Sequence, residues 1–273
     1  MKFSIIGTGF IFPAHAEAIR TIGGKIRHVV NAMHDEDAWR KMIETTDADC
    51  IVILAPNDLH FPMAMAAAEA GKIALVEKPL TIKSSEAEIL AAKPNIFTIL
   101  QLRQHPLFKE MKANVSDRQN YDIEMDISVH RDEKYYKSWK GIKERSGGVL
   151  FNLGIHYFEL LMHLFGEPTE ISTFSLSDKT GTGTIKGKNY FCRWKVSTDE
   201  KKDNQRRVFK INGVDYNYSS KDNLSFENLH RHVYEDILQG KGITPNEAIK
   251  SIRLIEKLYE AAASNSPIKI EKL

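Results

Sequence analysis

The stretch KFSIIGTGFIFPAHAEAIRTI, residues 2–22, combines a short apolar run, a Gly-Thr-Gly turn and a segment with helical periodicity. Glycines in this position let the backbone turn tightly after a strand and approach a pyrophosphate at the start of a helix. Gly7 and Gly9 are therefore candidate cofactor-binding residues. The third glycine of the dinucleotide fingerprint is absent, with Phe12 near its place, so this motif alone is weak evidence.

The same alternation continues through the first hundred residues. Apolar runs at residues 3–6, 26–30, 50–54, 73–76 and 96–100 alternate with helical patterns at 14–22, 36–43, 61–70 and 84–92. Repeated β-α units of this kind predict a parallel sheet covered by helices. We therefore predict a dinucleotide-binding Rossmann domain over residues 1–103.

After about Arg103 the rhythm changes to longer segments of mixed polarity, at residues 121–129, 170–176, 190–196 and 206–211, with a turn at Asn212-Gly213. Helices are expected at about 150–165, 226–238 and 246–263. The predicted fold class is α/β, with a C-terminal α+β domain over residues 104–273 that is built on a mainly antiparallel sheet.

Bulk properties exclude several classes of protein. The 38 basic and 36 acidic residues leave a net charge of +2, which gives no global field for nucleic acid. No apolar run suggests a signal peptide or a membrane segment, so we expect a cytoplasmic protein without membrane partners. Cys50 and Cys192 lie far apart in apolar runs and are interpreted as core residues. The histidines show no ligand spacing on one element, so no metal is expected.

The segment after the second predicted strand is unusual for a Rossmann site. An acid that binds the ribose is expected there, but the sequence reads Asn31-Ala32-Met33-His34-Asp35. Asn31 and His34 are candidates for the ribose, although they could equally be ordinary loop residues. The predicted cofactor is NAD, and NADP stays open because without an acid the repulsion of a 2′-phosphate is weaker.

Two strings lie at the expected carboxyl ends of the third and fourth strands, where ligands bind in open α/β sheets. The first is residues 55–60, APNDLH, and the second is Glu77-Lys78-Pro79. A lysine there can polarise a carbinol or carbonyl oxygen and support hydride transfer. Taken alone, Lys78 could be a surface lysine before a turn.

A further string, SGGVLFNLGIH at residues 146–156, places Asn152 and His156 four residues apart on one helix face. With the Glu-Lys-Pro motif, it resembles the glucose-fructose oxidoreductase and inositol dehydrogenase family of NAD(P)-dependent enzymes. The resemblance implies that His156 is an acid or base, that Asn152 orients substrate or nicotinamide, and that Lys78 shares the proton transfer. Histidine suits this role, although a histidine among leucines is more often a core residue.

Within the family, the whole chain resembles bacterial dehydrogenases that oxidise carbon 3 of UDP-N-acetylglucosaminuronate in the assembly of O-antigen, a lipopolysaccharide component. Asn152 in place of aspartate is a feature of that subgroup. The resemblance implies homo-oligomers, dimers or tetramers, and further cofactor contacts. The implied cofactor-binding residues are Phe10, Ile11, Pro56, Asn57, His60, Glu77, Lys78, Gln101, Arg103 and Trp139.

The same resemblance implies that Arg131, Tyr136, Ser138 and Lys140 handle the substrate, together with Lys78, Asn152 and His156. An acidic nucleotide sugar needs cations and stacking surfaces, and residues 131–145 form a locally basic run. That run could also be a solvated surface. Departures from the family are the missing ribose acid and the short region between the second and third strands.

Three functions remain open from the sequence. The leading one is oxidation of a nucleotide-linked sugar. The second keeps fold and cofactor but acts on UDP-N-acetylglucosamine, a free polyol, another sugar or an imino compound. The third is a non-catalytic NAD-binding sensor, against which the presence of both Lys78 and His156 argues.

Overall fold

The computed structural model describes residues 1–31, 36–217 and 226–273, and the chain divides into two compact units. The first unit comprises Met1–His105 and Phe226–Ile249, and the second comprises Pro106–Ser225 and Lys250–Leu273. The first change of unit falls close to the predicted boundary at residue 103. The assignment of residues 226–249 to the second domain is corrected, because this segment packs with the first unit.

The first unit is built on a parallel five-stranded sheet of order β2-β1-β3-β4-β5. Its strands are β1 (Lys2–Ile6), β2 (Lys25–Val30), β3 (Cys50–Ile53), β4 (Ile73–Glu77) and β5 (Ile96–Ile99). The chain leaves β1 in one direction to β2 and then returns to β3 on the other side. The carboxyl edge between β1 and β3 is therefore the topological switch point at which such sheets bind ligands.

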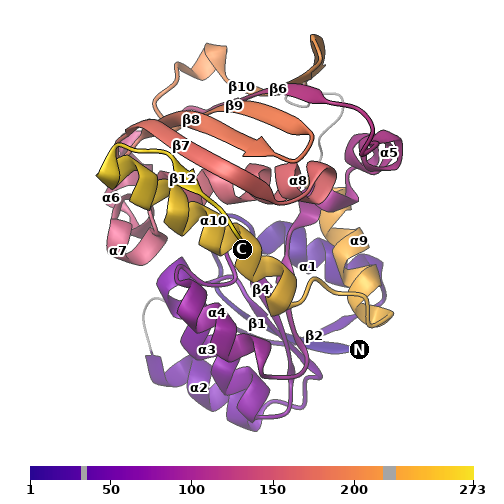
Figure 1. Cartoon of the computed structure of the whole chain (residues 1–273). Helices are drawn as coiled ribbons and strands as arrows, with labels where there is room; N and C mark the ends of the chain where they lie inside the picture. The colour runs from indigo at the N-terminus through magenta and orange to yellow at the C-terminus, as the bar shows by residue number, and fades with distance from the viewer. Residues whose placement is uncertain (32–35, 218–225) are drawn as a thin grey trace. The chain divides into compact units, whose positions relative to one another are not determined.

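Helices cover both faces of this sheet. They are α1 (Phe12–Thr21), α2 (Glu36–Thr45), α3 (His60–Glu69), α4 (Ser84–Ala91) and α9 (Phe226–Leu238), with short 3₁₀ turns η1 (Asn57–Leu59) and η2 (Gln101–Gln104). Helices α2, α3 and α4 lie together on one face, and α1 and α9 lie on the other (Figure 1). The regular β-α order predicted for residues 1–100 is confirmed.

Helix α9 joins the first unit through its apolar face. Val233, Tyr234 and Ile237 are buried in the same core cluster as Phe3 of β1 and Ile19 of α1. Burial of apolar side chains is the main stabilising contribution to such packing. The segment after α9 is tied to the sheet as well, because the Thr98 amide donates to the Ile243 carbonyl at 2.9 Å.

The second unit is built on a seven-stranded sheet of order β11-β10-β6-β9-β8-β7-β12. Its strands are β6 (Tyr121–Ser128), β7 (Pro168–Leu176), β8 (Thr180–Gly187), β9 (Tyr190–Ser197), β10 (Arg206–Ile211), β11 (Val214–Asn217) and β12 (Ile268–Lys269). All strand pairs are antiparallel except β6 and β9, which run parallel. The predicted mainly antiparallel sheet is confirmed.

The helical elements of this unit are α5 (Pro106–Asn114), α6 (Glu133–Lys137), η3 (Trp139–Gly141), α7 (Lys143–Ser146), η4 (Leu150–Gly154), α8 (Ile155–Phe165) and η5 (Lys202–Asn204). The division between the units runs through α10 (Pro245–Ser264). Helices α8 and α10 cover one face of the sheet, where Phe158 of α8 meets Trp194 edge to face and Thr173 of β7 donates to the Leu258 carbonyl (Figure 1).

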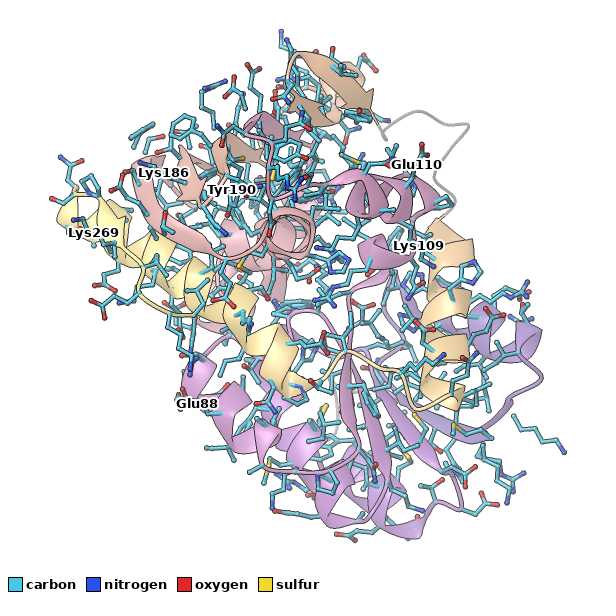
Figure 2. The ribbon with its side chains drawn as sticks, turned by 45° about the vertical axis from the view of Figure 1, so that its right-hand side comes forward. Glu88, Lys109, Glu110, Lys186, Tyr190 and Lys269 are labelled. Carbon is cyan, nitrogen blue, oxygen red and sulfur yellow. The ribbon has the colours of Figure 1, made fainter. Side chains whose placement is uncertain are left out.

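The opposite face of the sheet is exposed and carries mostly polar side chains, with Phe191 of β9 as an exposed apolar one. Strands β6 and β9 alternate buried and exposed residues, and Arg193 on the exposed face pairs with Asp122 at 2.8 Å. Figure 2 marks Lys186 of β8 and Tyr190 of β9 on neighbouring strands, and Lys109 and Glu110 on the exposed side of α5. This alternation is the usual pattern of an antiparallel sheet with one covered face.

The segment Lys143–Phe165 is long and apolar enough to cross a membrane by length and composition, but 72% of its most apolar window is buried inside the structure. It contains α7, η4 and α8, and its apolar side chains contact the sheet. It is therefore the core helix of the second unit. The expectation that no run approaches a membrane span is corrected to that extent.

Candidate active site

The turn after β1 has the backbone that a pyrophosphate site requires. Gly7 is buried, has φ of +109°, and donates its amide to the Val30 carbonyl at 2.8 Å. A Cβ at this position would collide with the backbone of Leu54, at the end of β3. Only glycine fits, because the turn is both left-handed and in close contact with the next strand.

Gly9 differs from Gly7. Apart from Thr8, Gly9 and Phe10 themselves, no heavy atom of the described residues lies within 4 Å of the position that a Cβ on Gly9 would take. The protein itself leaves this space open, beside the start of α1, whose N-cap residue Ile11 offers no side-chain acceptor to the first amides. An anionic group of a dinucleotide fits such a position, because the positive end of the helix dipole favours negative charge.

Two aromatic residues flank this turn. Phe10 is 92% exposed, and Phe12 packs against the core cluster that contains β1 and α1. In the fingerprint, the third glycine allows close packing of helix on strand. Here Phe12 provides the helix-strand contact instead, which explains how the turn forms without that glycine.

The ribose end of the predicted cofactor site is only partly described. Asn31 directly follows β2 and is exposed. His34 and Asp35 lie outside the described residues, so the candidate His34 contact stays a prediction. The choice between NAD and NADP depends on this segment.

The loops after β3 and β4 are held together by a buried histidine. His60 is 1% exposed, with Nδ1 2.6 Å from the Pro79 carbonyl oxygen and Nε2 2.9 Å from the Ala55 carbonyl oxygen. Burial lowers the pKa of His60, and the two carbonyl groups partly oppose this. The side chain thus links the two loops, while Pro56 and Asn57, both buried, occupy the turn that follows β3.

Glu77, the last residue of β4, is also occupied by protein groups. Its Oε1 lies 3.1 Å from His15 Nε2 and 3.7 Å from His230 Nε2, and its Oε2 accepts the Lys78 amide at 3.0 Å. The carboxylate therefore faces the interior, and the half-buried Lys78 follows at the carboxyl edge of the sheet. The sequence named Glu77 as a cofactor contact; the structure gives its carboxylate partners within the protein.

Two further predicted cofactor residues follow β5. Gln101 is buried in η2, and Arg103 pairs with Glu247 at 3.1 Å. Both partners of this ion pair belong to the first unit. Trp139, the remaining predicted cofactor residue, lies in η3 of the second unit and is half-buried.

In the second unit, Asn152 lies in a short π-helical turn, η4, immediately before α8. Its Nδ2 donates to the Lys140 carbonyl at 3.0 Å. Gly147 and Gly148, with φ of +78° and +81°, form the preceding turn, and the Tyr259 hydroxyl donates to the Gly147 carbonyl at 2.9 Å. Such π turns inside helices are frequent at functional sites. His156 follows one turn later and is half-buried.

A small cavity opens next to Asn152. It is lined by Tyr135, Tyr136, Lys140, Gly141, Lys143, Ser146, Gly148, Val149, Asn152, Asp178 and Thr198. A larger cavity of about 290 Å³ shares Lys143, Gly148, Val149 and Asp178 with it and extends to Tyr259. Three of the predicted substrate residues, Tyr136, Lys140 and Asn152, are therefore brought together at one cavity.

The cations near this cavity lie over aromatic rings. The Arg131 guanidinium carbon and Lys140 Nζ are each 5.4 Å from the centroid of Tyr135. Burial lowers the pKa of Lys140, and the Arg131 charge lowers it further. Because rings attract cations while two cations repel each other, the group is suited to an anion that would neutralise both.

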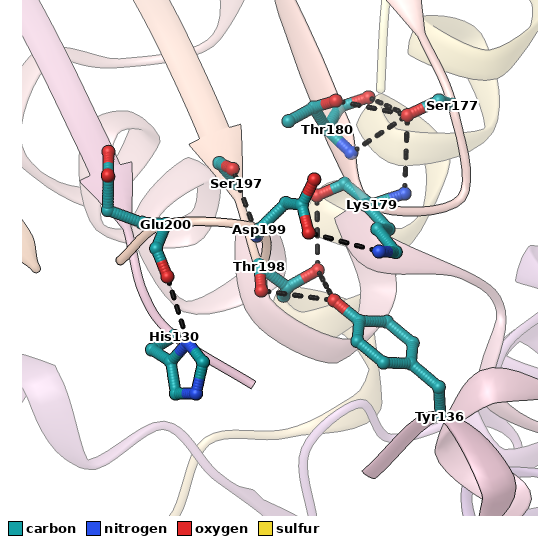
Figure 3. A network of polar contacts seen from close by, with 9 residues as sticks. All are labelled: His130, Tyr136, Ser177, Lys179, Thr180, Ser197, Thr198, Asp199 and Glu200. Atoms are coloured by element: carbon teal, nitrogen blue, oxygen red, sulfur yellow. Dashed lines mark hydrogen bonds and ion pairs between the residues drawn. The ribbon is translucent and has the colours of Figure 1, made fainter. Parts of the chain in front are cut away.

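Tyr136 is fixed by the ends of the neighbouring strands. Its hydroxyl lies 2.8 Å from Thr198 Oγ1 and 3.0 Å from the Thr198 carbonyl oxygen, and Lys179 Nζ is 4.9 Å from the ring centroid (Figure 3). Ser138 is engaged locally as well, since it caps η3 and donates to the Tyr135 carbonyl at 2.7 Å. Both side chains are therefore held by hydrogen bonds within the second unit, and Tyr136 lines the cavity.

Sequence reasoning missed several residues. Tyr135 had a signal, since it lies in the basic aromatic run, but Asp178 and Thr198 come from strand ends that no local pattern could place. His15, Glu77 and His230 offer ligand atoms within 4.8 Å of one another, although they come from three separate elements. The search for ligand spacing on one element could not detect this cluster.

Comparison with known proteins identifies both parts of the chain. Residues 1–94 match the family model GFO_IDH_MocA, an oxidoreductase family with an NAD-binding Rossmann fold. Residues 121–181 match the C-terminal alpha/beta domain of the same oxidoreductase family. The two matches agree with the two sheets described above.

Several curated relatives are inositol dehydrogenases. An NADP⁺-dependent scyllo-inositol 2-dehydrogenase of Bacillus subtilis is 25% identical over 145 residues, which is 50% of this chain and 40% of the relative. An inositol 2-dehydrogenase of Rhizobium meliloti is 25% identical over 173 residues, which is 60% of this chain and 48% of the relative. The matched part thus spans less than half of the length of these relatives.

Solved structures cover the whole chain. The WlbA dehydrogenase of Thermus thermophilus, in complex with NAD and UDP-GlcNAcA, has a TM-score of 0.82 at 26% identity and covers 100% of this chain and 97% of its own. The WlbA dehydrogenase of Bordetella pertussis, at 18% identity and a TM-score of 0.86, covers 100% and 98% and shares the fold. From the family matches, the chain belongs to the Gfo/Idh/MocA oxidoreductase family and carries its NAD-binding Rossmann domain.

Proposed function

We propose that the protein is an NAD(P)-dependent dehydrogenase that oxidises a secondary alcohol of a nucleotide sugar, namely carbon 3 of UDP-N-acetylglucosaminuronate (UDP-GlcNAcA), in surface polysaccharide biosynthesis. The observation that carries this proposal is the group of cations around Tyr135, beside the cavity at Asn152. It agrees with the ligand of the Thermus thermophilus dehydrogenase, which was solved with UDP-GlcNAcA.

The reaction requires removal of the proton from the hydroxyl group and of a hydride from the carbon that bears this group. When bound, NAD supplies the hydride acceptor. Lys78 and His156 are the proposed acid-base groups, and Asn152 orients the sugar. An imidazole suits proton transfer near neutral pH, and a lysine ammonium can polarise the developing carbonyl oxygen.

The substrate assignment depends on charge. Lys140 and Arg131 are near enough to share Tyr135, so each disfavours the other until an anion binds. A carboxylate on the sugar relieves this repulsion, whereas a neutral polyol does not. An acidic sugar is therefore favoured over inositol at this cavity.

A second candidate function is oxidation of inositol or another polyol, which is supported by the curated relatives from Bacillus subtilis and Rhizobium meliloti. It would use the same Lys78, His156 and Asn152. The two candidates differ in whether the basic residues near Tyr135 contact substrate. We also propose a homo-oligomer in the cytoplasm, as the resemblance implies.

Mass spectrometry of UDP-GlcNAcA tests this function. The sugar is incubated with the purified protein, NAD and a 2-oxo acid as hydride acceptor, in parallel with UDP-N-acetylglucosamine and scyllo-inositol. The expected product is UDP-GlcNAcA lighter by two hydrogens, with the two substrates that lack the uronate carboxylate turned over more slowly. Oxidation of scyllo-inositol alone would contradict the proposal in favour of the polyol function, and no oxidation despite bound NAD would support the sensor.

A further inference from the structure

Four buried polar residues from three elements form a connected group that ends at the backbone amide of Lys78. They are His15 of α1, Glu77 of β4, and His230 and Tyr234 of α9. The side chains of His15 and His230 are fully buried, that of Glu77 is 10% exposed, and Tyr234 is 1% exposed. We refer to them as the Glu77 cluster. All four belong to the first unit.

The contacts within the Glu77 cluster fix the direction of each hydrogen bond. Glu77 Oε1 lies 3.1 Å from His15 Nε2, and an ionised carboxylate can only accept, so Nε2 carries the proton. In a neutral ring Nδ1 then accepts, and it lies 2.8 Å from the Tyr234 hydroxyl, which donates. The other carboxylate oxygen accepts the backbone amide of Lys78 at 3.0 Å.

The charges agree with this arrangement. Burial lowers the pKa of His15, with Glu77 opposing it in part, so the ring is neutral near pH 7. Burial alone would raise the pKa of Glu77, but hydrogen bonding from the His15 and His230 side chains holds it well below its usual range. The cluster therefore contains one buried negative charge that is held by donors.

The same residues could be read as a metal site, since three ligand atoms lie within 4.8 Å of one another. The distance of 3.1 Å between Glu77 Oε1 and His15 Nε2 is that of a hydrogen bond with a proton between the atoms. A metal would need both atoms to act as acceptors. The chain of donors from Tyr234 to the Glu77 carboxylate is complete without one.

We propose that His15 and Tyr234 are positioning residues, which hold Glu77 so that Glu77 fixes the backbone amide of Lys78 and hence the point at which the lysine leaves the sheet edge. This rests on the proposed function only in assigning chemistry to Lys78. It also gives a reason for the return of the chain to the first unit as α9, because α9 supplies Tyr234 and His230. Small displacements of a catalytic group lower rates strongly.

Three variants separate positioning from packing. His15→Leu removes the donor to Glu77, whereas His15→Gln keeps an amide donor near the place of Nε2. Tyr234→Phe removes only the hydroxyl that donates to His15. Tyr190→Phe is the matched control, because Tyr190 is also buried but donates to the Gly166 carbonyl in the second unit.

Two readouts are measured on the full chain. The first is hydrogen exchange of the Lys78 amide by NMR, which needs no sugar and is independent of the proposed function. The second is kcat with UDP-GlcNAcA, together with the Kd for NADH. We expect His15→Leu to accelerate the exchange and lower kcat by about tenfold each, with the Kd for NADH unchanged, because the amide loses a fixed acceptor.

His15→Gln should restore both values to within about threefold of wild type, and Tyr234→Phe should change them in the same direction as His15→Leu by about threefold. Tyr190→Phe should leave both unchanged. Unaltered Lys78 exchange in folded His15→Leu and Tyr234→Phe would overturn the proposal, as would one zinc ion per chain in the purified protein by elemental analysis. Failure of wild type to oxidise any sugar would instead overturn the proposed function, while the exchange data still decide this inference.

Discussion

The two units place their polar groups in opposite ways. In the first unit, His15, His60 and Glu77 are buried, and their hydrogen bonds with the described residues are to other parts of the same unit. In the second unit, Lys140 and Arg131 are half-buried beside a cavity and lie over Tyr135. The hydrogen-bonded groups of the first unit suit a cofactor that is common to the family. The half-buried cations of the second unit suit a substrate that differs between relatives.

This difference suggests where specificity resides. Changes in the first unit should affect turnover with any substrate, because its buried groups support the loop that carries Lys78. Changes around the cavity of the second unit should alter which sugar is used. The variants below test whether the two units can be separated in this way.

The largest effect is expected for Lys78→Met. We expect kcat with UDP-GlcNAcA to fall by about 10²-fold or more, with the Kd for NADH within about twofold, because a proton-transfer group is lost. Lys83→Met is the matched control, since Lys83 is on the surface of the same unit and pairs with Glu86. Steady-state kinetics and NADH fluorescence measure both. Retention of half the activity by Lys78→Met would remove it from the chemistry.

His156→Ala should lower kcat by about 10²-fold if the imidazole transfers the proton. His163→Ala, on the same helix α8, provides the comparison. Activity and melting temperature are recorded for both variants. If His156→Ala lowers the melting temperature so far that unfolding accounts for the lost activity, His156 is a core residue and its proposed role is wrong.

A glycine in the second unit should affect stability and leave the chemistry intact. At Gly183 in β8, an added Cβ would collide with the Ser172 carbonyl and lie 2.8 Å from the Trp194 ring. We expect Gly183→Ala to lower the free energy of unfolding by about 1–3 kcal/mol, as overpacking does. Gly181→Ala should cost less, because its nearest contacts are side chains at 3.0 Å and 3.1 Å. Urea denaturation ranks the two, and equal stability of Gly183→Ala and wild type would contradict this packing.

The same strand shows why the sequence predicted the second unit less completely. The polar stretch TGTGTIKG, residues 180–187, has none of the apolar alternation that marks a strand, yet β8 is an interior strand of the sheet. Gly181 and Gly183 are explained by the Trp194 ring, which belongs to the next strand. Because Trp194 lies outside residues 180–187, the sequence of this segment alone cannot show why it forms a strand.

In the first unit, local signals and the fold agree, because each strand and helix has its own periodicity. The features of the first unit that the sequence did not predict are contacts between residues far apart in the chain. Helix α9 was assigned to the wrong unit because amphipathic periodicity shows that a helix has a buried face but leaves open which core receives it. The Glu77 cluster escaped prediction for the same reason, since His15 and Tyr234 are 219 residues apart.

Lys140→Met should change substrate preference more than turnover. We expect the KM for UDP-GlcNAcA to rise about tenfold, with kcat nearly unchanged, because a charged hydrogen bond to the carboxylate is lost. The KM for UDP-N-acetylglucosamine should change little. Lys137→Met, in the same basic run but 71% exposed, is the control. An equal rise in KM for both sugars would mean that Lys140 does not recognise the acidic group.

The smallest effect is expected from pH. Burial and the Arg131 charge lower the pKa of Lys140 below 10.5, so its positive charge is lost as pH rises through a range in which an ordinary lysine stays charged. The KM for UDP-GlcNAcA should therefore increase by about threefold on the alkaline side, while that for UDP-N-acetylglucosamine stays level. In Lys140→Arg the charge persists, because a guanidinium keeps its proton, and the alkaline increase should disappear. If the increase persists in Lys140→Arg, another group titrates and the cations at Tyr135 do not set the choice of sugar.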